Sequence, residues 1–65
     1  MKPKINDAVQ LVEDLPSAAR SKGDVGTIVA VFSEPEEAYE VEFCNESGET
    51  VAQVALRPNQ FVVAN

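Results

Sequence analysis

Hydrophobic and polar residues alternate along most of the chain, a pattern typical of β-strands with one buried face. The clearest case is residues 38–44, where Tyr39, Val41 and Phe43 alternate with Glu40 and Glu42. We expect the three apolar side chains to face a core and the two glutamates to face water.

Four further segments have strand character: residues 8–13, 25–32, 49–56 and 61–63. Residues 25–32 are nearly all apolar and β-branched, which suits a strand that is strongly bent or covered on both sides. Gly26 within it suggests a bulge or tight bend. Residues 45–48 end in Gly48, which tolerates positive φ, and they predict a hairpin that makes the flanking strands antiparallel.

The pattern therefore predicts an all-β fold: one domain over residues 1–65, built as a small, strongly bent, five-stranded antiparallel barrel. Curling should remove the exposed edges of so small a sheet. Residues 14–24 are expected to form a loop, with Leu15 plugging one end of the core. The expected core residues are Val9, Leu11, Val25, Ile28, Tyr39, Val41, Phe43, Val54, Leu56 and Phe61.

Length limits what such a domain can do. A chain of roughly 60 residues buries only about 60% of its unfolded surface, so we expect no interior substrate cavity and a marginal stability that a homo-oligomer would raise. The chain has no histidine and one cysteine, Cys44, so it lacks the commonest acid-base catalyst and any clustered Cys/His zinc ligands. We expect no enzyme activity, no catalytic residues, no cofactor and no bound metal. The lone cysteine and the absence of an apolar run of membrane-spanning length indicate a cytoplasmic protein.

Charge is the most informative compositional feature. The net charge is −6, and residues 23–56 contain eight acidic residues and no lysine or arginine. Nucleic-acid binding depends on lysine and arginine contacts to phosphate, so this balance argues against a nucleic-acid partner. Two interpretations remain open: the acids keep a small protein in solution, or they form a docking face for a basic protein partner.

Three other features have simpler structural explanations than chemical ones. Gly23 and Gly26 lead into a strand and lack the Lys-Ser/Thr ending of a phosphate-binding loop, so they indicate a tight turn. Cys44 has no histidine to activate it and fits a small hydrophobic residue at a strand end. Of the aromatic residues, only Phe32 is spare once the core is filled, too few to pave a groove for proline-rich peptides.

The segment from Lys22 to Val29 carries a Gly-x-x-Gly-x-aliphatic turn into the second strand, which resembles the turn of SH3-like barrels and their short KOW modules. Together with residues 13–16, 38–43 and 48–52, it makes nearly the whole chain similar to a bacterial domain-of-unknown-function family of small stand-alone proteins. The resemblance implies an SH3-like barrel and an accessory protein, paired with a neighbouring partner in the manner of toxin and antitoxin. It implies no activity.

The sequence thus predicts a non-catalytic protein-interaction module. The residues expected to bind the partner are the acidic row Glu40 and Glu42 with Glu36 and Glu37 beside it, and the loop around Leu15, Arg20 and Lys22. The alternative is a KOW-like nucleic-acid or ribosome-associated module. That alternative requires a compact basic patch formed by Lys2, Lys4, Arg20, Lys22 and Arg57.

Overall fold

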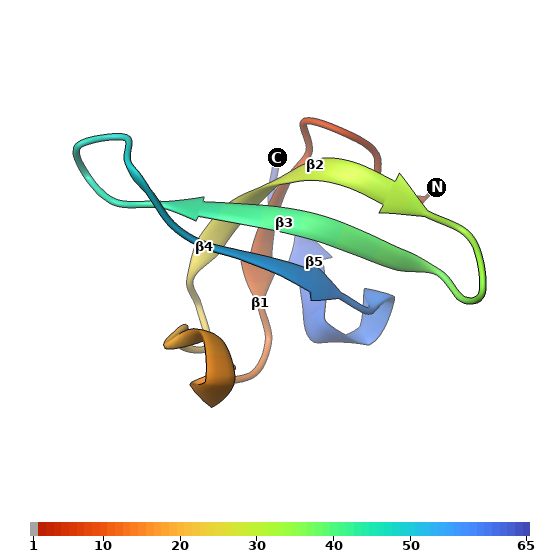
Figure 1. Ribbon diagram of the computed structural model, residues 1–65, viewed down its shortest axis with the longest axis horizontal. Coiled ribbons are helices and arrows are strands. Elements are labelled where there is room, and N and C mark those ends of the chain that lie inside the picture. Colours follow the sequence, from red (N-terminus) through yellow and green to blue (C-terminus); the bar gives the residue numbers. More distant parts are fainter. Residues whose placement is uncertain (1) are drawn as a thin grey trace.

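Five antiparallel strands form one strongly bent sheet in the computed structural model, which describes residues 2–65 (Figure 1). The elements are β1 (Ala8–Leu11), the 3-10 helix η1 (Pro16–Ala18), β2 (Val25–Phe32), β3 (Ala38–Cys44), β4 (Thr50–Leu56), the 3-10 helix η2 (Pro58–Gln60) and β5 (Phe61–Val63). The order across the sheet is β4-β3-β2-β1-β5. The predicted all-β, five-stranded antiparallel fold is confirmed.

The sheet is barrel-like but open. Its outermost strands, β4 and β5, are not hydrogen-bonded neighbours, so the expectation that curling would remove the edges is wrong. Strand bounds match the alternation closely, with two differences. β1 ends at Leu11 rather than residue 13, and the Val12 N–H donates to the carbonyl of Gln60, which belongs to no strand. β4 begins at Thr50 rather than residue 49.

The core lies on the inner, concave side of the sheet. Tyr39, Val41 and Phe43 are each at most 1% exposed, as their alternation with glutamate predicted. The other buried apolar residues are Val9, Leu11, Leu15, Ile28, Leu56 and Phe61, and Val54 packs against them while half-buried. The Tyr39 and Phe61 rings meet edge to face, with centroids 5.4 Å apart.

Val25 is the one predicted core residue that lies outside, at 55% exposure. It pairs with Gln10 on β1, whereas the next pair along, Val9 with Gly26, faces the core. Successive residues of a strand point to opposite faces, so a buried Gly26 places Val25 in solvent. The register shift in β2 also differs from expectation: it falls between Ile28 and Ala30 rather than at Gly26.

Residues 14–24 form an ordered excursion closed by short-range hydrogen bonds. The Leu15 N–H donates to the Arg20 carbonyl at 2.8 Å, and the Arg20 N–H donates to the Leu15 carbonyl at 3.1 Å, so the two residues pair across η1. The Asp14 carboxylate accepts from the Lys22 N–H at 2.8 Å, and the Asp24 carboxylate accepts from the Ser21 N–H at 2.9 Å. These bonds hold Leu15 against the core, where it was predicted to lie.

Candidate functional site

The outer face of β3 carries two glutamates that point away from the core. Glu40 lies between Ala30 of β2 and Ala55 of β4, and Glu42 lies between Thr27 and Gln53. Both glutamates are half-buried. Among residues 2–65, neither forms an ion pair with a lysine or arginine. Glu42 accepts one hydrogen bond, from Cys44 Sγ at 3.8 Å, and no cation of the described chain neutralises either charge.

Glu36 and Glu37 lie between β2 and β3, just before β3 begins. Glu36 pairs with Arg57 at 2.9 Å, and Glu37 pairs with Lys2 at 3.8 Å. Glu37 also accepts a hydrogen bond from the Tyr39 hydroxyl, which belongs to the inner side. That bond, reinforced by burial of the phenol, raises the pKa of Tyr39 to about 12. The four predicted glutamates thus form two separate groups.

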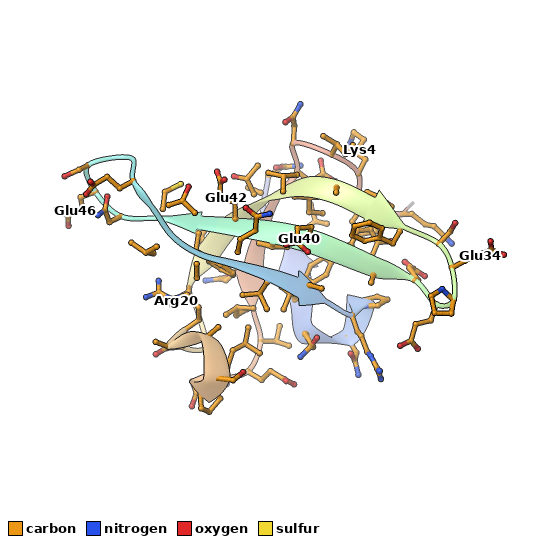
Figure 2. The ribbon with its side chains drawn as sticks, viewed as in Figure 1. Lys4, Arg20, Glu34, Glu40, Glu42 and Glu46 are labelled. Carbon is orange, nitrogen blue, oxygen red and sulfur yellow. The ribbon has the colours of Figure 1, made fainter. Side chains whose placement is uncertain are left out.

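Negative charge continues along the length of the molecule beyond these groups. Figure 2 shows Glu40 and Glu42 along β3, with Glu34 in the β2–β3 loop at one end and Glu46 in the β3–β4 hairpin at the other. The longest dimension of the molecule is 31 Å. Glu34 and Glu46 therefore lie at the two ends of the molecule, away from Glu40 and Glu42.

The predicted loop residues have unequal access to a partner. Leu15 is buried at 9% exposure and supports the loop from beneath. The Arg20 guanidinium lies 3.6 Å from the Asp24 carboxylate, and its Nε donates to the Ala19 carbonyl. Lys22 is exposed. Of these three residues, only Lys22 has an exposed charge that forms no ion pair within the described chain.

Four of the five basic residues are paired with acidic residues. Lys2, Lys4, Arg20 and Arg57 each pair with a neighbouring acid, the Lys4 partner being Asp7 at 3.2 Å. Figure 2 places Lys4 and Arg20 on opposite sides of β3. Lys4 and Arg20 therefore do not share one basic patch.

An open pocket of about 470 Å³ lies where the two chain ends meet, lined by Lys2, Lys4, Asp7, Val63 and Asn65. Asp7 is the one buried charged residue of the described chain, at 6% exposure. Its carboxylate accepts from the Lys4 N–H at 3.0 Å and from the Asn65 amide at 2.8 Å. These hydrogen bonds, with the smaller contribution of the Lys4 ammonium, lower the pKa of Asp7.

Sequence reasoning missed Asp7, and no local signal identifies it. Asn65, its hydrogen-bond partner, is 58 residues away and is brought close because β5 lies beside β1. The Asn65 side-chain carbonyl also accepts from the Ala8 N–H at 2.7 Å. The pair holds the C-terminal Asn65 against the residues that lead into β1, which is a structural role.

Two of the exposed apolar residues, Phe32 and Val51, lie far from each other on the sheet. Phe32 pairs with Ala38 at the start of β3, whereas Val51 lies beside the register shift between Phe43 and Cys44 at the end of β3. The two are therefore at opposite ends of that strand. Phe32 and Val51 are each 46% exposed, so these two residues do not form a common apolar surface.

Within residues 2–65 no three histidine, cysteine, aspartate or glutamate side chains group as a metal site would require. The described helices are all too short or too polar to cross a bilayer. A family model described as "Domain of unknown function (DUF4926)" matches residues 5–63. No curated protein and no solved structure matches the chain.

Proposed function

For this chain, which belongs to the DUF4926 family of unknown function, we propose a non-catalytic role as a protein-interaction module with an SH3-like barrel. Its binding surface is the outer face of β3, and its partner is a protein with a basic surface. The observation that carries the proposal is the contrast between two pairs of glutamates. Glu36 and Glu37 are neutralised by Arg57 and Lys2, whereas Glu40 and Glu42 are not.

The contrast matters because charges already paired within the protein contribute little to attracting a partner. Unpaired charges of one sign on one face raise the rate of association and exclude partners of like charge, and apolar contacts then supply affinity. Glu40 and Glu42 flank small or neutral residues, Ala55 and Gln53, on β4. A basic side chain therefore meets no competing cation on that face of β3 and β4.

The other predicted properties fit this role. The resemblance to bacterial stand-alone proteins supports an accessory protein of the antitoxin type, and the single free cysteine, Cys44, suits a reducing cytoplasm. The nucleic-acid alternative receives less support, because four of the five basic residues lie in ion pairs. It predicts a mobility shift of RNA or DNA at about 50 mM salt, where phosphate contacts are strongest.

The test is affinity capture from a lysate of the source cells with three immobilised proteins: the wild type, E40Q/E42Q and E34Q/E46Q. The two double variants have the same net charge, and Glu34 and Glu46 are exposed residues at the two ends of the molecule. We expect the wild type and E34Q/E46Q to retain the same protein at about 50 mM salt, and E40Q/E42Q to lose it. About 500 mM salt should release this protein from the first two. Equal capture by the two double variants would contradict the proposed surface.

A further inference from the structure

The free edge of β4 is the least protected feature of the fold. β4 bonds to β3 on one side and stands at the end of the strand order. No residue from Thr50 to Leu56 takes part in a backbone hydrogen bond outside the sheet pairing. In an edge strand, alternate residues direct their N–H and C=O groups outward, so β4 offers a row of unsatisfied donors and acceptors.

The two edges of this sheet differ in how they are protected. Proteins usually keep an edge from pairing with other chains by making it short or by placing charges or proline on it. β5 is three residues long, whereas β4 has seven residues, Thr50-Val51-Ala52-Gln53-Val54-Ala55-Leu56, with neither a charge nor a proline. Its pairing with β3 is continuous from Ala52 to Leu56. The register shifts at Val51, and the five residues from Ala52 to Leu56 form the regular part of β4 that can accept a neighbour.

The face beside this edge indicates what the neighbour carries. Ala55 separates the edge from Glu40, and Gln53 separates it from Glu42. Adjacent strands lie about 4.8 Å apart, so a residue added opposite Ala55 has its backbone about 10 Å from that of Glu40. A lysine or arginine side chain at that position extends across the small alanine side chain to the glutamate carboxylate. On the inner face the added strand lies beside Ala52 and Val54, which are half-buried and favour aliphatic neighbours.

We propose that β4 accepts an extended segment of the partner protein as a sixth strand, with basic residues at alternate positions on the outer face and aliphatic residues between them. Backbone hydrogen bonds to β4 hold the segment, and Glu40 and Glu42 select its charge. The proposal rests on the proposed function and specifies how the partner binds. A second copy of this chain fits the edge poorly, since each copy has a net charge of −6 and brings its own Glu40 and Glu42.

The probe is a blocked nine-residue peptide in which lysine alternates with valine and threonine. Two versions carry N-methyl groups on alternate residues, one set at the odd and the other at the even positions. All three peptides have the same charge, and only one methylated version blocks the amides that face β4. We expect that version to bind about tenfold or more weakly than the parent, and the other to remain within about threefold, because several backbone hydrogen bonds are lost in one case only.

Binding is followed by amide chemical shifts and hydrogen exchange of the isotopically labelled protein. The parent peptide should shift and protect the amides of Thr50–Leu56, and binding should weaken several-fold in E40Q/E42Q. Ala55→Lys places a cation on the path to Glu40 and should weaken binding, whereas Val62→Lys makes the same charge change on β5, at an equally exposed position, and should not.

Three results would overturn strand addition. The first is no binding at about 1 mM peptide, a concentration that detects even millimolar affinity. The second is equal binding of the two methylated peptides, and the third is chemical-shift changes confined to elements other than β3 and β4. The free protein could also form a dimer that Ala55→Lys dissociates. That result would overturn strand addition by a partner and assign the edge of β4 to a second copy of the chain. Each of these can occur while E40Q/E42Q still loses its captured partner, so failure of strand addition and failure of the proposed function are distinguishable.

Discussion

Gly26 is the position where the smallest change in this protein should have a large effect. It lies in the middle of the sheet on β2, opposite Val9, and its φ is not in the left-handed region. A Cβ atom built there would lie 2.6 Å from Val41 Cγ1, 2.8 Å from the Glu42 carbonyl oxygen and 3.0 Å from Phe43 Cδ1. The glycine is required because β3 approaches closely, and Gly26→Ala tests that reason.

The magnitude follows from what must move. The Glu42 carbonyl is backbone within a paired strand, so relief of the contact displaces β3 as well as two core side chains. Overpacking of this kind costs about 1–3 kcal/mol, offset by about 0.4–1 kcal/mol because alanine restricts the unfolded chain. Because a paired backbone carbonyl must move, the cost lies at the upper end of its range, about 3 kcal/mol, and the offset leaves a fall in the free energy of unfolding of about 2 kcal/mol, within a total of about 3–10 kcal/mol for a chain of this length. The melting temperature should fall by about 8–16 °C.

Urea denaturation followed by far-UV circular dichroism measures the loss, and Thr27→Ala is the matched control. Thr27 is the next residue of β2 and is exposed on the outer face, so its replacement should change stability by no more than about 1 kcal/mol. Resonances of Val41 and Phe43 should shift in Gly26→Ala and remain in place in Thr27→Ala. A Gly26→Ala protein within about 0.5 kcal/mol of the wild type would refute the close-approach argument.

Two further predictions concern pH and the chain ends. The pKa of Tyr39 is about 12 in the folded protein and about 10 when unfolded, so the contribution of Tyr39 to stability should be constant below pH 10 and be lost as pH rises from 10 through 12. The chain has one tyrosine, so absorbance near 295 nm follows the titration of Tyr39. Glu37→Gln should lower the pH of the titration midpoint. An unchanged midpoint would show that the hydrogen bond to Glu37 does not cause the raised pKa. The pKa of Asp7 is lowered by hydrogen bonds from Lys4 and Asn65, so its contribution to stability is present above its unfolded pKa of about 3.9 and is lost as pH falls through the lower folded value. Asn65→Ala should raise the Asp7 pKa measured by NMR, and a pKa identical to that of the wild type would show that Asn65 plays no part.

The proposed interaction and the fold depend on the same alternation in β3. The side chains of Tyr39, Val41 and Phe43 build the core, and the residues between them carry the charge that we assign to partner selection. A substitution at Glu40 or Glu42 should therefore alter binding while leaving the core contacts in place. This separation makes the double variant E40Q/E42Q a usable test of function, because its folding can be confirmed independently.

Local sequence patterns were sufficient to predict most of the fold. The bounds of β3 follow from alternation, since a period of two places every second side chain on the same face wherever the strand lies, whereas β2 and β5 follow from short runs of β-branched and aromatic residues. Gly48 and the residues before it predicted the hairpin, and the structure has Gly48 at φ 81°. These features depend on neighbours in sequence, so the sequence contains the information needed to predict them.

What only the tertiary structure decided depends on which strands lie side by side. Val25 appeared apolar enough for the core, but its pairing with Gln10 turns it to solvent. The burial of Asp7 beside Asn65 and the separation of Glu36 and Glu37 from Glu40 and Glu42 arise from contacts between distant segments. The free edge of β4 belongs to the same class, because whether a bent sheet closes depends on the distance between its first and last strands, which no local pattern encodes.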